Sequence, residues 1–298
     1  MLLDLLKQTL HALWARANRR ANRLTGGVFG IVVTGARRFL HSRATEAAAG
    51  MAYYALFSLF PLLIFLVALG SFVLETNQVR QQVVVWLVNL FPTAADLIEH
   101  NLELVITRRG PAGATAIVGL LWAGSGAFNA LARNINRAWP NARPRNFLSG
   151  RLVALAMIVA LALLLFLSLF AGTLAGLMPF LNGGGVWDGA SRLATGLSTV
   201  LFPFAMFVVL YRWVPNARVT WVEAGWGAVV ATIGWRGGIA AFTWYLSSGL
   251  ANYQLVYGTL GTVIALMFWI YLSSLITLFG AHLSAAVALH RRLAQAGE

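Results

Sequence analysis

Side chains that could perform catalysis are few in this sequence. The chain has nine acidic residues, five histidines and no cysteine among its 298 residues. No pair of histidines has metalloprotease spacing, and the glycine patterns of nucleophile elbows, phosphate loops and dinucleotide-binding turns are missing. The lack of cysteine excludes disulfides, thiol catalysis and thiolate metal sites. We therefore predict that the protein is not an enzyme, uses no cofactor and binds no metal.

Arg236 is the charged residue in the most unusual position. It lies inside a long apolar stretch, 222–246, at a depth near the middle of a bilayer. A charge there costs at least about 2.5–3.5 kcal/mol on insertion scales, so it should face protein or water. We predict that Arg236 lines a polar cavity and contacts an anionic group, with Gly237 and Gly238 leaving room. The alternative is an arginine that caps carbonyl groups inside the bundle or reaches outward to the interface.

Further candidates for a substrate path lie at the ends and bends of the apolar stretches. Glu46 opens the first stretch, where an acid either stabilises the helix N-terminus or forms a gate or proton site. Pro61 and Pro203 fall inside the first and fourth stretches, each in a Leu-Phe-Pro triplet. Proline frees backbone carbonyls that can line a cavity, and matched breaks in two halves would suit an inverted repeat. Ordinary packing kinks are the alternative.

Six long apolar stretches must position these residues. Hydrophobic residues make up 59% of the chain and charged residues 10%, with a mean hydropathy of +0.74. A chain this apolar needs lipid as part of its solvent. We predict an all-α, polytopic membrane helix bundle with transmembrane helices at about 47–74, 112–128, 152–178, 194–211, 222–246 and 256–289. They form one membrane domain, 46–290, between a basic amphipathic segment, 1–45, and a short tail, 291–298.

The distribution of positive charge orients this bundle. The formal charge is +13, and 17 of the 22 Lys and Arg residues fall in the N-terminal segment, the second and fourth loops and the C-terminus. The other three loops hold four. The positive-inside rule therefore predicts that both termini are cytoplasmic. Such a bias explains the high isoelectric point without a nucleic-acid partner. We also predict amphipathic interfacial helices at 1–24, 83–90 and 94–106.

Several stretches resemble the YihY/BrkB family of bacterial inner-membrane proteins. They are, in the family's order, AAAGMAYYALFSLFP (47–61), ALARNINRAW (130–139), LYRWVPNARVTW (210–221) and the segment 245–281. The resemblance covers roughly residues 40–290 and adds Ser58, Tyr257, Gly258 and His282 to the substrate-path candidates. One departure is His282, which follows Gly-Ala where the family usually has glutamate. A neutral histidine can hydrogen-bond, but it titrates near neutral pH, so a role for that acid does not transfer unchanged.

The resemblance implies a bacterial cytoplasmic-membrane protein associated with envelope lipids, serum resistance or virulence. Members were formerly described as a transfer-RNA-processing ribonuclease, but cleavage by two metals needs clustered carboxylates. The acids expected on the cytoplasmic side are dispersed: Asp4, Glu46, Glu223 and Glu298. We expect a transporter or lipid flippase-like protein whose partners are membrane lipids and an anionic lipid or small-molecule substrate. A non-transporting envelope scaffold is the alternative, a ribonuclease is least favoured, and an oligomer is compatible with either.

Overall fold

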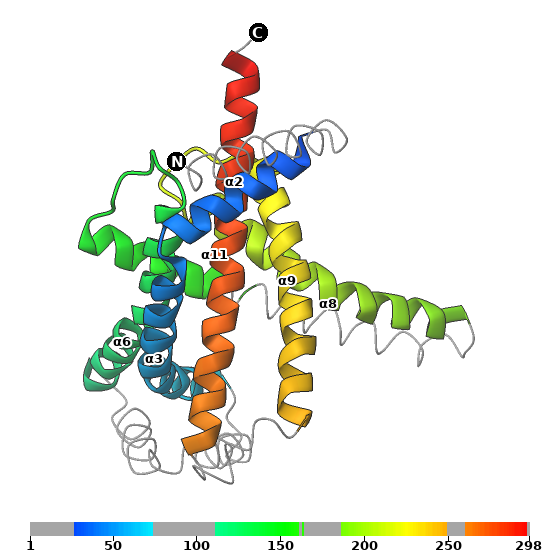
Figure 1. Ribbon diagram of the computed structural model, residues 1–298. Helices are drawn as coiled ribbons and strands as arrows, with labels where there is room; N and C mark the ends of the chain where they lie inside the picture. Colours follow the sequence, from blue (N-terminus) through cyan, green and yellow to red (C-terminus); the bar gives the residue numbers. More distant parts are fainter. Residues whose placement is uncertain (1–26, 74–110, 161–162, 164–185, 249–259, 297–298) are drawn as a thin grey trace.

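The computed structural model describes residues 27–73, 111–160, 163, 186–248 and 260–296, and the regular elements among them are all α-helices (Figure 1). The predicted all-α class is confirmed for this part of the chain. The interfacial helices predicted at 1–24, 83–90 and 94–106 lie outside the described residues, as do Tyr257 and Gly258.

The first described helix, α2 (Val28–His41), is separate from the helix that follows it. It begins after Gly27, whose φ of 92° is in the left-handed region that favours glycine. It ends where the Ser42 hydroxyl donates a 2.8 Å hydrogen bond to the carbonyl of Phe39. After this turn the chain enters α3 (Ala44–Val73), whose first turn contains Glu46. An acid there faces the positive end of the helix dipole, which is one of the two roles considered for Glu46.

Two of the remaining helices begin with residues that favour the N-terminus of a helix. The remaining helices are α6 (Pro111–Arg137), the helix Phe147–Ala160, α8 (Val186–Trp213), α9 (Trp221–Ser247) and α11 (Leu260–Ala296). Pro111 occupies the first position of α6, where its missing N–H costs nothing. Thr220 and Glu223 form a capping box at the start of α9, with the Thr220 N–H donating to Glu223 Oε2 at 2.7 Å.

These helices coincide with the predicted apolar stretches but are often longer. α6 continues to Arg137, whereas the predicted stretch ends at residue 128, and α8 begins at Val186 instead of residue 194. Hydropathy marks only the apolar part of a helix, and a helix can continue through polar residues beyond it. α3 and α8 both continue through their internal prolines, so neither helix is interrupted at Pro61 or Pro203.

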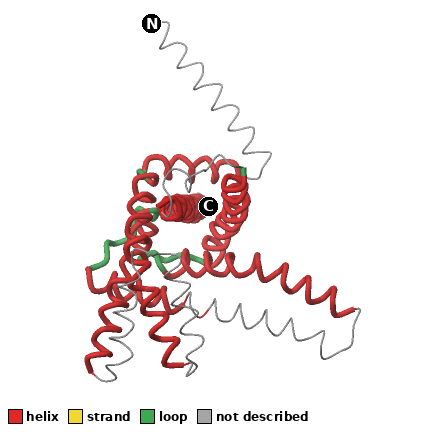
Figure 2. The backbone as a smooth tube through the Cα atoms, turned by 90° about the horizontal axis from the view of Figure 1, so that it is seen from below, coloured by secondary structure: helices red, strands yellow, loops and turns green. Residues whose placement is uncertain are grey.

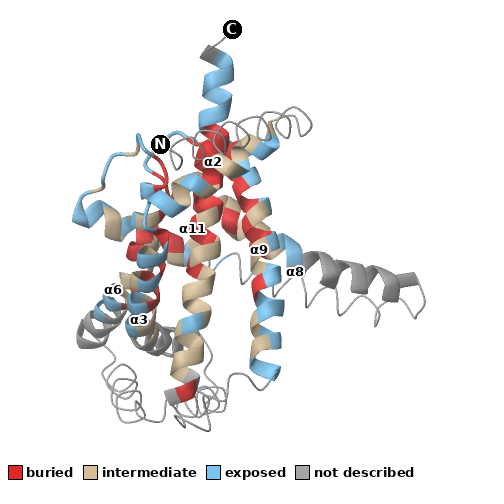
Figure 3. Ribbon diagram, in the orientation of Figure 1, coloured by how far each residue is buried: buried red, intermediate tan, exposed pale blue. Residues whose placement is uncertain are grey.

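α11 is the central element of the fold. It packs against α9, α2 and α3, while α3 pairs with α6 and α8 pairs with α9 (Figure 1). Figure 2 looks along α11 and shows other helices arranged around its axis. The buried residues gather around the half of α11 nearest the C-terminus (Figure 3). Many of them are alanines that let helices approach closely, including Ala224, Ala228 and Ala231 of α9 and Ala281, Ala285 and Ala288 of α11.

Large apolar side chains are exposed on the outward faces of α3 and α9. They are Tyr53, Tyr54 and Phe57 on α3 and Trp226, Val229, Ile233, Ile239 and Trp244 on α9. A surface of this kind suits lipid as its solvent. By length and apolar composition, Val263–Gln295 of α11 could cross a membrane, whereas the apolar helices Phe147–Ala160 and Val200–Trp213 are shorter. The number of crossings stays a prediction.

Candidate functional site

One end of the molecule collects the segments that the charge distribution assigns to one side of the membrane. Asn216 joins two loops there. One loop connects α6 with the helix Phe147–Ala160, and the other connects α8 with α9. The N–H of Asn216 donates to Asn136 Oδ1 at 2.7 Å, and its side-chain amide donates to the Arg143 carbonyl at 3.1 Å. The end of α11 joins them because Arg292 donates to the Arg218 carbonyl at 3.5 Å. Segments that are far apart in the sequence therefore lie together at this end, and the topology itself stays a prediction.

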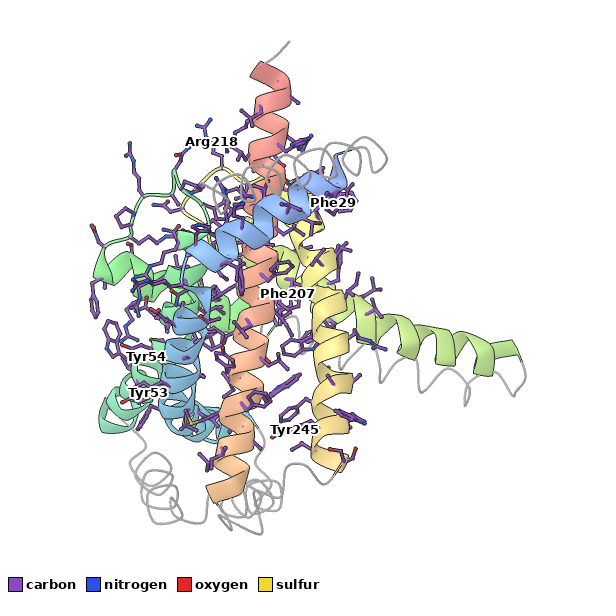
Figure 4. All side chains as sticks on the ribbon, viewed as in Figure 1. Phe29, Tyr53, Tyr54, Phe207, Arg218 and Tyr245 are labelled. Carbon is purple, nitrogen blue, oxygen red and sulfur yellow. The ribbon has the colours of Figure 1, made fainter. Side chains whose placement is uncertain are left out.

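A cavity of about 450 Å³ opens at this end, which we name the arginine pocket. Its lining comes from α2, from both loops and from α11: Arg38, Trp139, Pro140, Asn141, Ala217, Arg218, Ala285, Ala288, Leu289 and Arg292. Three guanidinium groups and an apolar wall therefore share one cavity, and no carboxylate is among the lining residues. Figure 4 shows Arg218 near the C-terminal part of α11, far from Tyr245 at the opposite end.

The charges of the arginine pocket are not neutralised within the described residues. None of the carboxylates described there forms an ion pair with Arg38, Arg218 or Arg292. Trp139 is 5% exposed, and its indole N–H is buried without a hydrogen-bond partner among the described residues. Guanidinium groups donate hydrogen bonds and accept none. An anion with several oxygens, such as a phosphate, matches this set of donors.

A second cavity of about 280 Å³ lies between the last turns of α6 and the start of the helix Phe147–Ala160, and we name it the asparagine pocket. Its lining residues are Asn129, Ala132, Arg133, Asn136, Arg137, Pro144, Arg145, Asn146, Phe147 and Gly150. Asn129 is 6% exposed, and a Cβ at Gly150 would lie 3.2 Å from Asn129 Oδ1. Gly150 therefore leaves this carboxamide accessible from the cavity. Partial burial lowers the pKa of Arg145, which nevertheless remains charged.

Arg236 lies apart from both pockets. Its side chain is exposed on α9, and it forms no hydrogen bond or ion pair with the described residues. A Cβ at Gly237 would meet nothing within 4 Å, whereas one at Gly238 would lie 2.9 Å from Ile276 Cδ1. Gly238 therefore serves the packing of α9 on α11, and Arg236 points away from that contact. The polar cavity expected around Arg236 stays a prediction.

Ser58 and His282 lie at contacts between helices. Ser58 is buried on α3, where its hydroxyl accepts a 3.1 Å hydrogen bond from the backbone N–H of Ala127 on α6. His282 is buried on α11, and its Nε2 lies 3.0 Å from the Ser42 hydroxyl at the turn between α2 and α3. Its ring packs edge-on against Phe39 of α2. Among the described residues, both side chains hold helices together.

The other two candidates on the described helices are also placed apart from the pockets. Glu46 is exposed and lies 3.7 Å from Arg43. Pro203 is buried within α8. The side chain of Pro61 lies outside the described residues. The candidates whose side chains the structure describes are thus not gathered at one site.

The sequence interpretation used the arginines of the arginine pocket only to orient the chain. Arg38, Arg218 and Arg292 belong to segments distant in sequence, and helix packing brings them together. The only indication in the sequence that these arginines could meet was that the charge distribution assigns their segments to the same side of the membrane. Trp139 ends the stretch ALARNINRAW, which entered the sequence analysis only through the family resemblance.

The long apolar helices, their exposed aromatic faces and the basic pockets at one end define a helical membrane protein. Residues 36–298 match the family described as virulence factor BrkB, so the chain belongs to that family. Two relatives named UPF0761 membrane proteins agree with the membrane assignment. The one from Mannheimia succiniciproducens is 28% identical, covering 88% of this chain and 90% of its own. The one from Haemophilus influenzae is 26% identical, covering 84% and 92%.

A further relative is the Bacillus subtilis protein YfkH, whose name describes it as ribonuclease-like. It is 30% identical over 266 residues, covering 86% of this chain and 93% of its own. No solved structure matches the chain. The expected YihY/BrkB membership is thereby confirmed.

Proposed function

We propose that the protein is a transporter or lipid flippase-like protein of the bacterial cytoplasmic membrane that acts on an anionic lipid. The arginine pocket carries this proposal. Three guanidinium groups and an apolar wall surround a cavity whose lining offers no carboxylate. The pocket receives the phosphate of a lipid headgroup, because charge-assisted hydrogen bonds from several donors select such a group.

The apolar part of the lining favours a lipid over a small soluble anion. Ala285, Ala288 and Leu289 of α11 form a wall beside the arginines. A headgroup phosphate would contact the guanidinium groups while its glycerol carbons cover this wall. The basic residues also draw the pocket toward an anionic leaflet.

The proposal includes six membrane crossings with both termini in the cytoplasm, which places the arginine pocket at the inner leaflet. Two observations support it. The basic residues are concentrated in alternate segments. Arg38 of α2, Trp139 and Arg218 of two loops, and Arg292 of α11 come from those segments and line one pocket.

The proposal includes no catalysis, because the pocket offers no carboxylate for a metal and no histidine for proton transfer.

Reconstitution in vesicles tests this function. The purified protein is placed in phosphatidylcholine vesicles containing a trace of fluorescent phosphatidylglycerol, and movement of the label between leaflets is followed by chemical quenching. We expect the protein to accelerate movement of the anionic label over protein-free vesicles, and more than that of a phosphatidylcholine label. The double variant Arg38→Gln/Arg292→Gln should lose most of this acceleration.

Arg291→Gln is the matched control, because Arg291 is adjacent to Arg292 but reaches Thr220 at 3.5 Å outside the pocket. It should move lipid like the wild type. Equal acceleration by the wild type and the double variant would refute the role of the pocket. Tight binding of anionic lipid without any movement would instead identify a scaffold.

A further inference from the structure

The asparagine pocket differs chemically from the arginine pocket. Its lining combines guanidinium groups with carboxamides and with the ring of Phe147. A carboxamide both donates and accepts hydrogen bonds, so it can pair with a hydroxyl group in either direction. The arginine pocket offers one asparagine, Asn141, which is exposed.

Asn129 is the buried polar group without a partner in the asparagine pocket. It is 6% exposed, and its carboxamide forms no hydrogen bond with the described residues. Asn136, by contrast, has hydrogen-bond partners for both ends of its carboxamide. Its oxygen accepts from the Asn216 N–H, and its amide donates to the Arg143 carbonyl. A buried amide without partners is costly, so a ligand that supplies them is expected to bind tightly there.

The positive end of a helix faces the same cavity. The helix Phe147–Ala160 begins at the pocket, and Phe147 and Gly150 of its first turn line it. The N–H groups of a first helical turn have no partner within the helix and attract anions. Arg145 is held beside them because its guanidinium donates to the Val214 carbonyl. Arg133 and Arg137 add positive charge from α6.

We propose that the asparagine pocket binds a phosphate that carries neighbouring hydroxyl groups, the chemistry of a glycerol phosphate. The phosphate lies at the helix N-terminus among the arginines, and Asn129 pairs with a hydroxyl. This chemistry is offered by a free glycerol phosphate and by the headgroup of phosphatidylglycerol. The site is separate from the arginine pocket and does not depend on lipid transport.

Calorimetry on the full-length protein in nanodiscs tests the site. In phosphatidylcholine nanodiscs we titrate sn-glycerol 3-phosphate, inorganic phosphate and glycerol. We expect glycerol phosphate to bind at least about tenfold more tightly than either fragment, because only it uses both the charged groups and the carboxamide. In nanodiscs containing phosphatidylglycerol, unchanged binding identifies the free compound as the ligand, and weakened binding identifies the lipid headgroup.

Two variants remove different parts of the site. Asn129→Asp keeps the shape but places a negative charge against the phosphate, and Arg133→Gln changes an exposed residue that the core does not need. Each should weaken glycerol phosphate binding about tenfold or more. Gln295→Glu, at an exposed residue of α11 that lines neither pocket, is the control for an added negative charge and should leave this binding unchanged.

Several outcomes would overturn the proposal. They are no binding of glycerol phosphate in either nanodisc, equal affinity for glycerol phosphate and inorganic phosphate, or wild-type affinity in the folded Asn129→Asp and Arg133→Gln proteins. Failure of the lipid-movement experiment would leave these measurements intact, because Arg38 and Arg292 do not line the asparagine pocket.

Discussion

The hydroxyl of Tyr211 on α8 donates a buried hydrogen bond of 2.8 Å to the backbone carbonyl of Thr277 on α11. This bond crosses a junction where α8, α9 and α11 meet without room for another methyl group. A Cβ at Gly227 of α9 would lie 2.7 Å from the Gly280 carbonyl oxygen and 2.7 Å from Ser284 Cβ. The Ser284 hydroxyl in turn donates to the Glu223 carbonyl at 2.8 Å. The junction is held by close backbone approach and by hydrogen bonds between helices.

Gly227→Ala should therefore destabilise the protein. The added methyl group must displace backbone atoms of α11, and such overpacking costs about 1–3 kcal/mol. Gly225→Ala on the same helix is the control, because a Cβ there meets nothing within 4 Å. It should be neutral or stabilising by up to about 1 kcal/mol through helix propensity. Thermal unfolding in detergent measures both, and equal melting temperatures would contradict this account of the junction.

Arg218→Gln should weaken anion binding in the arginine pocket. The change removes one of the three guanidinium groups of the pocket at an exposed residue, so the buried core is unchanged. We expect phosphatidylglycerol to raise the melting temperature of the wild type and to raise that of the variant less, because stabilisation by a ligand follows its affinity. Arg143→Gln, at an exposed arginine that lines neither pocket, should retain the full shift. The prediction is wrong if both variants respond like the wild type.

Reporter fusions should place both ends of the membrane domain in the cytoplasm. The prediction rests on the alternation of basic segments and on their meeting at the arginine pocket. Alkaline phosphatase fused after residue 298 should be inactive, and the same enzyme fused after residue 183 should be active. A green fluorescent protein fusion should give the reverse pattern. Active phosphatase at residue 298 would overturn the topology.

Stringently purified protein should not cleave RNA. Glu223 is committed to the capping box of α9, and the exposed Glu46 lies beside Arg43 at the start of α3. Within the part of the chain that the structure describes, neither is placed with other carboxylates that could hold two metal ions. We expect no cleavage of transfer RNA in the presence of Mg²⁺ or Mn²⁺, and a lower melting temperature for Glu223→Gln. Cleavage that persists through purification and disappears in folded Glu46→Gln or Glu223→Gln protein would contradict this prediction.

The sequence predicted the long helices well because apolar runs are a local property. It did not predict α2 as a helix docked on α11, where a Cβ at Gly35 would lie 3.2 Å from Leu283 Cα. An amphipathic segment can cover either lipid or protein, and its pattern does not distinguish them. Ser58 was predicted on a substrate path but contacts Ala127 of α6. The convergence of Arg38 with Arg218 and Arg292 depends on helix packing, which single residues do not reveal.

Substitutions of Arg236 can distinguish a structural role of this arginine from a role in substrate binding. It lies on the exposed side of α9, one turn beyond Ile233, which is 67% exposed. An arginine that capped carbonyl groups inside the bundle would stabilise the fold. Without a partner among the described residues, its replacement should change the unfolding free energy by no more than about 0.5 kcal/mol.

We therefore predict that Arg236→Gln keeps the wild-type melting temperature in detergent but loses most of the lipid movement. A charge inside an apolar stretch is energetically costly, and contact with the anionic headgroup of a moving lipid would offset that cost. Arg236→Lys should retain part of the activity, because it keeps the charge but not the planar set of donors. Thr243→Gln, at another exposed position on α9, controls for a polar substitution on this surface. A fully active Arg236→Gln protein would show that the arginine does not contact the substrate, and a large fall in its melting temperature would assign it to the fold.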